Sequence, residues 1–302
     1  MNKVYSGLAS IPKGSSPDTV TPGCLVLEGG AFRAVYGEGV LDRLLEDGIN
    51  FGCAVGVSAG ALNGFNYISG QIGRAARINL SQRYNSRYVG LKAMKENHGI
   101  IGFKYAFSGD MNGVEAFDFD RFNDPRRRFV AVCTNLANGK AEYFEKGQCQ
   151  DIFQAIRASA SMPYLSKPVT VDGIPCLDGG VRVKIPYRWA LDEGYEKVVV
   201  VETKPRGMRR NESSPEARCA KFFYRSRPEF AQALSTSLVR ANQEEEELER
   251  LTDSGRVFTV WPSKDMQVDR IERDLDKLGD WYWLGYNDMA GRLGELRDYL
   301  GI

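Results

Sequence analysis

Histidine and paired cysteines are scarce in this 302-residue sequence, and their scarcity argues against several kinds of site. His98 is the only histidine, which leaves almost no room for a metal centre built on several imidazole ligands. The six cysteines are scattered and form no Cys-x-x-Cys pair, the spacing typical of zinc and redox motifs. Three of them lie in apolar runs, where we expect reduced, buried thiols.

Long apolar runs and an excess of either charge are also missing. No uninterrupted apolar segment approaches the roughly 20 residues of a membrane-spanning helix. The first twenty residues lack the apolar core of a signal peptide. Forty basic residues face thirty-nine acidic ones, so the chain as a whole has no charge that would attract nucleic acid or anionic lipid. We expect a soluble, cytoplasmic protein with no nucleic acid partner.

The composition is that of a large globular protein. Hydrophobic residues make up 43% of the chain and charged residues 26%, which argues against general disorder. We expect residues 1–22 to form an N-terminal arm, because they are rich in serine, proline and glycine. Residues 23–205 are expected to form the core region, and residues 206–302 a helical portion packed on the same domain.

Short, continuously apolar segments alternate with helical patterns through the core region. Residues 24–28 and 51–55 are expected to be buried strands, each followed by a glycine turn and a helix. Continuous rather than alternating hydrophobicity is typical of a parallel sheet covered on both faces. The sequence therefore predicts an α/β fold, a three-layer sandwich with a mostly parallel central sheet flanked by helices. The other expected strands are 129–133, 141–144, 169–171, 176–178, 197–203 and 256–261.

The segment Gly56-Val57-Ser58-Ala59-Gly60 has the pattern G-x-S-x-G between a predicted strand and a predicted helix. In that context the serine occupies a sharp turn that exposes its oxygen above the sheet, and the flanking glycines avoid collisions. The positive end of the helix dipole also faces this oxygen. The alternative is an ordinary small-residue turn, but the context favours Ser58 as a nucleophile.

A serine nucleophile needs a base, and histidine does not offer one here. No histidine follows position 98, and His98 itself lies in a polar stretch typical of an exposed loop. We therefore expect a carboxylate as the base. The best candidate is Asp178, which ends a predicted strand and precedes Gly179-Gly180. A plain turn is the competing interpretation of that segment.

A carboxylate is a weak base for a serine hydroxyl, so much of the catalysis must come from stabilising the developing oxyanion. This requires backbone N–H groups that no side chain obstructs, and Gly29-Gly30 after the first strand can supply them. The alternative is a nucleotide-binding turn, but the G-x-G-x-x-G spacing fails because position 34 is alanine.

These segments, in this order, resemble the patatin-like phospholipase family. The matching segments are 25–45, 56–64, 156–168 and 176–190, within roughly residues 23–205. The resemblance implies hydrolysis of acyl esters of lipids by a Ser–Asp dyad on an α/β sheet, without a metal or other cofactor. By position, Ser58 is the nucleophile and Asp178 the proton acceptor. Backbone groups of Gly29, Gly30 and Ala31 form the oxyanion hole.

Four positions can be compared with the family pattern. Arg33 matches the basic residue of the glycine loop and is the expected substrate-binding residue. Ala31 and Ala34 stand where the family usually has glycine, and N–H donation is retained if the backbone angles stay negative. Lys184 replaces an asparagine that many members have after Asp-Gly-Gly.

We therefore expect a serine acyl hydrolase of the lipase or phospholipase type that forms an acyl-enzyme. A lipid or acyl ester is its expected substrate, with transient contact to a membrane surface as a further possibility. Two alternatives stay open. An acyltransferase would use the same dyad, and a non-catalytic lipid-binding protein would explain the departures at Ala31, Ala34 and Lys184.

Other features are expected to be structural. Residues 103–107 and 281–286 are rich in aromatic side chains; we expect core packing, although the first segment lies where a lid would be. Residues 126–128 are three arginines, expected to be a solvated start of a strand. Residues 244–247 are four glutamates, expected to form a charged helical face that Arg240 and Arg250 partly balance.

Overall fold

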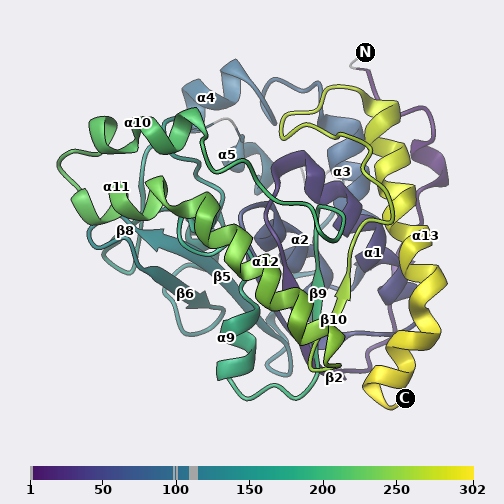
Figure 1. The fold of residues 1–302 in the computed structure, drawn as a ribbon. Coiled ribbons are helices and arrows are strands. Elements are labelled where there is room, and N and C mark those ends of the chain that lie inside the picture. Colours follow the sequence, from purple (N-terminus) through teal and green to yellow (C-terminus); the bar gives the residue numbers. More distant parts are fainter. Residues whose placement is uncertain (1–2, 98, 100, 109–114) are drawn as a thin grey trace.

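A computed structural model describes residues 3–97, 99, 101–108 and 115–302 (Figure 1). Its middle layer is a sheet of eight strands within the described residues. The strands are β2 (Thr21–Leu27), β3 (Phe51–Val57), β5 (Arg128–Asn135), β6 (Ala141–Glu145), β7 (Val169–Val171), β8 (Ile174–Asp178), β9 (Val198–Val201) and β10 (Phe258–Val260). Their order is β10-β9-β2-β3-β5-β8-β7, with β6 also paired to β5.

The sheet is mostly parallel and covered by helices on both faces. β10, β9, β2, β3 and β5 run parallel, whereas β6, β7 and β8 are antiparallel to their neighbours. Alternate residues of β2 enter different cores: Leu25 and Leu27 face one, Cys24 and Val26 the other. The predicted α/β three-layer sandwich is therefore confirmed, and each predicted strand segment overlaps an observed strand.

Helices on the two faces come from different parts of the chain. The first face packs against α1 (Val35–Glu46), α2 (Ala59–Ile68), α3 (Arg74–Gln82), α8 (Ile152–Ser159) and α13 (Leu275–Leu300). The second face packs against α9 (Tyr187–Asp192) and α12 (Ser237–Asp253), and α12 crosses in front of the sheet in Figure 1. Shorter helices in the connections are α4 (Leu91–Asn97), α5 (Phe103–Ala106), α7 (Phe119–Asn123), α10 (Pro215–Phe223) and α11 (Pro228–Ser235).

Both ends of the chain are packed against the central region. Near the N-terminus, Tyr5 and Ile11 are buried, and β1 (Gly14–Ser15) pairs with β4 (Gln71–Ile72). Near the C-terminus, β10 extends the sheet and α13 packs along α1 (Figure 1). The aromatic segment 281–286 belongs to this helix, and Trp281 is buried there, so core packing of that segment is confirmed.

The contact between α1 and α13 depends on two glycines. A Cβ at Gly39 would lie 2.0 Å from the Tyr282 carbonyl oxygen, and one at Gly285 would lie 2.0 Å from the Tyr36 carbonyl oxygen. The two helix backbones are therefore in direct contact at this crossing, and no larger residue fits at either position. This close approach fixes the C-terminal helix beside the segment that follows the glycine loop.

Candidate active site

Ser58 occupies a strained turn between β3 and α2. Its φ of 57° and ψ of −124° lie where non-glycine residues are rare, and such strain is found at functional sites. The flanking glycines are required for space: a Cβ at Gly56 would lie 2.4 Å from the Gly60 carbonyl oxygen, and one at Gly60 would lie 2.4 Å from the Leu27 carbonyl oxygen. This is the geometry expected for a nucleophile elbow.

Strand β5 brings Asp178 to this serine. One edge of β5 pairs with β6, and the opposite edge pairs first with β3 and then with β8. Val57, the last residue of β3, is opposite Val132, and Asp178, the last residue of β8, is opposite Cys133. The ends of β3 and β8 therefore meet along β5, one residue from Ser58.

At this meeting point the Ser58 hydroxyl donates a hydrogen bond of 2.8 Å to Oδ2 of Asp178. The other carboxylate oxygen accepts from the Gly180 N–H at 2.7 Å. Burial raises the pKa of Asp178 above its usual range, while the Lys184 cation, the hydrogen bond from Ser58 and the Gly180 N–H oppose the rise. A carboxylate with a raised pKa is a stronger proton acceptor for a serine than an exposed one.

The glycine loop passes directly beside Ser58. A Cβ at Gly29 would lie 2.9 Å from the Val57 carbonyl oxygen and 3.0 Å from Cβ of Ser58. Within the described residues, no acceptor is bonded to the backbone N–H groups of Gly29, Gly30 or Ala31. The three loop residues line the same cavity as Ser58, and their backbone N–H groups are not used in the hydrogen bonding of the described residues.

The two alanines of this loop differ in conformation. Ala31 has a φ of 51°, in the left-handed region that favours glycine, so the condition of a negative angle is not met there. Ala34 has a φ of −68° and needs no special freedom. Arg33 is half-buried, its carbonyl oxygen accepts from Nε1 of Trp281 at 2.7 Å, and its own Nε has no hydrogen-bond partner among the described residues.

Two cavities meet at Ser58. The wide one has a volume of about 880 Å³, and its wall includes Asp178, the glycine loop and Arg33. The narrow one has a volume of about 100 Å³ and a largely apolar wall that includes Leu62, Ile78 and Phe107. Ala31, Ser58 and Met162 line both cavities, so the serine oxygen stands at their junction. Phe107 of the aromatic segment 103–107 thus borders a cavity next to the serine.

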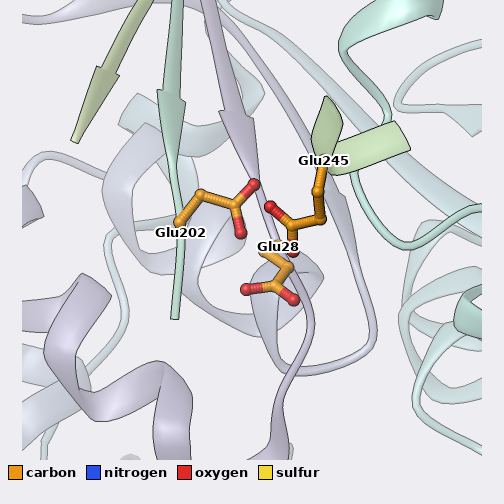
Figure 2. Close-up of side chains that lie close together, drawn as sticks. All are labelled: Glu28, Glu202 and Glu245. Carbon is orange, nitrogen blue, oxygen red and sulfur yellow. The ribbon is translucent and has the colours of Figure 1, made fainter. Parts of the chain in front are cut away.

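Next to the wide cavity, three buried carboxyl groups point toward one another (Figure 2). Glu28 follows β2, Glu202 follows β9 and Glu245 comes from α12. Arg210 bridges Glu28 and Glu245, and Lys204 lies 3.4 Å from Glu28. Cationic side chains therefore already occupy one oxygen of Glu28 and one of Glu245, whereas neither oxygen of Glu202 has a hydrogen-bond partner among the described residues.

The carboxyl groups of this cluster differ in their tendency to be protonated. Burial alone would raise the pKa of Glu28, but Lys204 and Arg210 outweigh it and hold the pKa well below its usual range. Burial and the two neighbouring carboxylates instead hold the pKa of Glu202 far above its usual range. A protonated Glu202 can donate a hydrogen bond to Glu28, so the arrangement is a paired ionic network behind the glycine loop.

Sequence reasoning was wrong about one arginine of the segment 126–128. Arg127, expected in a solvated stretch, is only 2% exposed and bonds to Asp18 at 3.2 Å. Glu244 and Glu245 of the charged face of α12 are buried, whereas Glu246 is exposed. Short runs of like charge do not reveal a partner from a distant segment, so the burial of these residues was not predicted. His98 lies outside the described residues.

Four basic residues of the wide cavity carried no signal in the sequence. They are Lys204, Arg209, Arg210 and Arg270. Lys204 comes three residues after the end of β9, next to Thr203, which borders the glycine loop. Arg270 lies in the connection between β10 and α13, more than two hundred residues from the glycine loop that it borders.

The structure thus combines an α/β sandwich with a serine at a strained strand–helix turn and an aspartate that is hydrogen-bonded to it. The family model described as patatin-like phospholipase matches residues 25–191, more than half of the chain. The chain therefore belongs to the patatin-like phospholipase family. A second model, described as a domain of unknown function (DUF6363), matches residues 227–301, which include β10, Arg270 and α13.

Individual relatives are distant. An uncharacterized Escherichia coli protein, YjjU, is 27% identical over 188 residues, which cover 61% of this chain and 52% of that protein. Lysophospholipase NTE1 of Meyerozyma guilliermondii is 26% identical over 59% of this chain but only 12% of its own length. The crystal structure of VipD from Legionella pneumophila matches with a TM-score of 0.40 and 14% identity, covering 97% of this chain and 70% of that one. In the described part of the chain, no helix is both long and apolar enough to cross a bilayer.

Proposed function

We propose that the protein is a serine hydrolase for carboxylic esters of lipids, of the phospholipase A or lysophospholipase type. The observation that carries the proposal is the 2.8 Å hydrogen bond between Ser58 Oγ and Asp178 Oδ2 at a strained strand–helix turn. Membership of the patatin-like phospholipase family supports lipid-ester hydrolysis at the family level. The fungal relative is itself named a lysophospholipase, which is in line with this proposal.

In this mechanism Asp178 accepts the hydroxyl proton while Ser58 Oγ attacks the acyl carbon. The negative charge that develops on the carbonyl oxygen is stabilised by the free N–H groups of Gly29, Gly30 and Ala31. Collapse of the tetrahedral intermediate breaks the bond to the alcohol oxygen, which takes the proton from Asp178. Asp178 then removes a proton from water, the hydroxide attacks the acyl carbon, and Ser58 is released with its proton.

We assign one half of the substrate to each of the two cavities. The narrow, largely apolar cavity suits the acyl chain, because burial of each methylene contributes about 0.8 kcal/mol. The wide cavity suits the alcohol portion with its head group, which needs more space and polar contacts. Ser58 stands between them, where the ester bond of such a substrate would lie.

A covalent probe tests the proposal directly. A fluorophosphonate should label the folded wild-type protein at Ser58, and peptide mapping should find the adduct there. The Ser58→Ala variant should lose both labelling and ester hydrolysis, while its far-ultraviolet circular dichroism stays that of the wild type. Absence of an adduct in folded wild-type protein would favour a lipid-binding protein without catalysis.

Product analysis separates hydrolysis from transfer. With a lipid ester and an added acceptor alcohol, a hydrolase yields mainly free fatty acid, because water reaches the acyl-enzyme. A new ester formed at the expense of the fatty acid would instead identify an acyltransferase that uses the same two residues. The readout is chromatography of the acyl products with and without the alcohol.

A further inference from the structure

Cationic side chains dominate the ionisable groups of the wide cavity. Six basic residues line it, and three acidic residues do so: the former are Arg33, Lys184, Lys204, Arg209, Arg210 and Arg270, and the latter are Glu28, Asp178 and Asp269. Because Asp178 belongs to the dyad, the head-group side of the cavity has an excess of positive charge. The question is which of these cations are free to bind a ligand.

Half of the cations are already paired with carboxylates. Arg210 bridges Glu28 and Glu245, and Lys204 lies beside Glu28. Arg209 bonds to Glu249 on α12 at 2.8 Å. These three side chains hold the wall of the cavity together, and their charges are largely compensated.

The other three cations form no ion pair with a carboxylate, although Lys184 lies near Asp178 of the dyad. Within the described part of the chain, no acidic side chain lies within ion-pair distance of Arg33, Lys184 or Arg270. All three side chains line the same cavity. Burial lowers the pKa of Arg33 and of Lys184; Glu28 opposes this at Arg33 and Asp178 at Lys184, while Arg270 adds to the lowering at both. Unpaired cations that face one another repel, and a bound anion would relieve this repulsion.

Lys184 lies close to the dyad, and hydrogen bonds to backbone carbonyl groups hold the loop of Arg270 beside it. Nζ of Lys184 and Oδ1 of Asp178 flank Gly180, because a Cβ there would lie 3.2 Å and 3.0 Å from them. The carbonyl oxygen of Arg270 accepts from the Phe32 N–H at 3.1 Å, which ties its loop to the glycine loop. Arg83 also donates to the carbonyl oxygens of this loop, at residues 271 and 272.

We infer that Arg33, Lys184 and Arg270 form a binding site for a phosphomonoester group on the alcohol portion of the substrate. This inference rests on the proposed function, since it assigns the head group of the ester that Ser58 attacks. A phosphomonoester has about two negative charges at neutral pH and several acceptor oxygens, which matches guanidinium and ammonium donors. A choline head group would bring a fixed cation into the same positive cavity, and a plain glycerol head group would leave the three cations uncompensated.

Three lipids with one acyl chain test this selectivity. Monoacylglycerol phosphate, the corresponding phosphocholine lipid and plain monoacylglycerol are compared by kcat/KM in mixed micelles of constant composition. We expect the phosphomonoester to be hydrolysed roughly 10- to 100-fold more efficiently, since one charge-assisted hydrogen bond contributes about 1.5–3 kcal/mol. The Arg270→Ala variant should lower the ratio of phosphomonoester to monoacylglycerol hydrolysis by roughly 10-fold.

A matched control comes from the same loop. Arg273 is exposed, lies three residues from Arg270 and does not line the cavity, so Arg273→Ala removes the same charge without touching the site. It should retain the wild-type ratio. Lys184→Arg should keep the preference and Lys184→Met should lose it. Equal ratios in wild type, Arg270→Ala and Arg273→Ala would overturn the inference while leaving the proposed hydrolase intact.

Binding without turnover keeps the test independent of catalysis. Calorimetric titration of the Ser58→Ala protein with glycerol phosphate should detect binding that Arg270→Ala in the same background weakens. Inorganic phosphate is titrated in parallel: equal binding of both would indicate a site for free phosphate rather than for a lipid head group. No binding of either would refute the site even if esters are hydrolysed.

A second, independent observation concerns the surface at the mouth of the wide cavity. Phe222 and Phe223, at the end of α10, are 70% and 63% exposed. The Phe223 ring lies 5.3 Å from that of Tyr164, which lines the wide cavity. Large exposed aromatic residues are unusual on a soluble surface and mark contact sites.

Basic residues surround this aromatic pair. The segment 218–227 contains four cations and no acidic residue: Arg218, Lys221, Arg225 and Arg227. All four are exposed, and none of their side chains has an acidic partner among the described residues. Adjacent aromatic and cationic side chains match the interface of a bilayer with anionic lipids, where rings insert and cations bind the head groups.

We therefore propose that residues 218–227 dock the protein on an anionic lipid surface, with the mouth of the wide cavity facing the bilayer. The test is sedimentation with phosphatidylcholine vesicles, with and without phosphatidylglycerol. Wild-type protein should bind the anionic vesicles. The Phe222→Ala/Phe223→Ala variant should bind at least roughly 10-fold more weakly, because it lacks the two apolar rings that would be buried in the bilayer.

Controls distinguish the lipid surface from other occupants. Ile302→Ala removes another exposed apolar side chain, 62% exposed at the C-terminus, and should bind like wild type. Equal thermal unfolding midpoints show that all variants are folded. Equal vesicle binding by the double variant would overturn the proposal. Concentration-dependent sedimentation without vesicles, lost in the double variant, would show instead that a second copy of the chain covers the surface.

Discussion

The two cavities that meet at Ser58 differ in almost every physical property. The narrow one is bordered by apolar side chains from α2, α3 and the segment around α5, and its volume would hold little more than part of one acyl chain. The wide one is nearly nine times larger by volume and is lined by six cations and the aspartate of the dyad. The first therefore distinguishes ligands by shape, and the second by charge.

They also differ in where their walls come from. The narrow cavity is built from residues 31–162, within the segment that matches the patatin-like phospholipase model. The wide cavity adds residues 204–271, and Arg270 comes from the segment that matches DUF6363. The narrow cavity thus lies within the family domain, whereas the wide cavity is completed by the C-terminal portion.

The largest effect is expected when Asp178, the proposed base at the junction of the two cavities, is replaced. Asp178→Asn keeps the shape of the side chain but cannot accept the Ser58 proton, so kcat for a lipid ester should fall by roughly 10⁴-fold. The measurement is release of fatty acid under saturating substrate. Activity within 10-fold of wild type would mean that another group acts as the base.

The next largest effect concerns the wall of the wide cavity. Arg210→Met leaves the buried carboxylates of Glu28 and Glu245 without their shared partner, and the free energy of unfolding should fall by about 3–5 kcal/mol. Urea denaturation measures this. Arg209→Met is the control, because its pair with Glu249 is partly exposed and contributes at most about 1 kcal/mol. Equal losses in both variants would contradict the buried network.

A bulky residue in the narrow cavity should lower activity on long-chain esters more than on short-chain esters. Ala75 lines it, and Ala75→Phe removes space for about three or four methylenes of an acyl chain. At about 0.8 kcal/mol each, kcat/KM for a long-chain ester should fall roughly 100-fold relative to an acetyl ester of the same alcohol. A uniform loss for both esters would show that the acyl chain lies elsewhere.

The pH dependence sharpens the electrostatic part of the comparison. Asp178 must be deprotonated to act, and its pKa is raised by burial, so kcat/KM should decline on the acid side at a higher pH than an ordinary aspartate would give. Lys184 opposes the rise, so Lys184→Met should move this decline to still higher pH. Lys184→Arg should restore the wild-type profile. An unchanged profile in Lys184→Met would show that this cation does not act on the dyad.

The smallest effect is expected at the only histidine. His98→Gln should leave ester hydrolysis within about 3-fold of wild type, because the proposed proton acceptor is a carboxylate. Assays of initial rate at neutral pH decide this. A loss as complete as for Asp178→Asn, or a rate profile governed by a group titrating near pH 6.5, would point to imidazole.

Sequence patterns predicted the parts of the molecule that depend on local chemistry. The parallel strands follow from continuous apolar runs, and the turn at Ser58 follows from Gly56 and Gly60, whose missing side chains leave space for neighbouring carbonyl groups. Asp178 was identifiable because a glycine pair follows a strand end. Its distance to Ser58, however, depends on how β8 pairs with β5, and no local pattern encodes that pairing.

The charges of the wide cavity could not be predicted in the same way. Glu245 belongs to a run of four glutamates, and only its partner Arg210 distinguishes it from its exposed neighbour Glu246. Arg270 is ordinary in sequence and becomes significant because the Phe32 N–H binds its carbonyl oxygen. Such contacts join segments far apart in the chain, so a single sequence does not reveal them.

The shared edge of β5 has a consequence for how the protein acquires reactivity. Because β3 and β8 meet on that edge, a slip of β8 by one position would turn the carboxyl group of Asp178 to the opposite side of the sheet. Assembly of the reactive pair is therefore coupled to the correct alignment of strands far apart in the chain. A chain in which the sheet has not yet closed would therefore lack the hydrogen-bonded pair of Ser58 and Asp178.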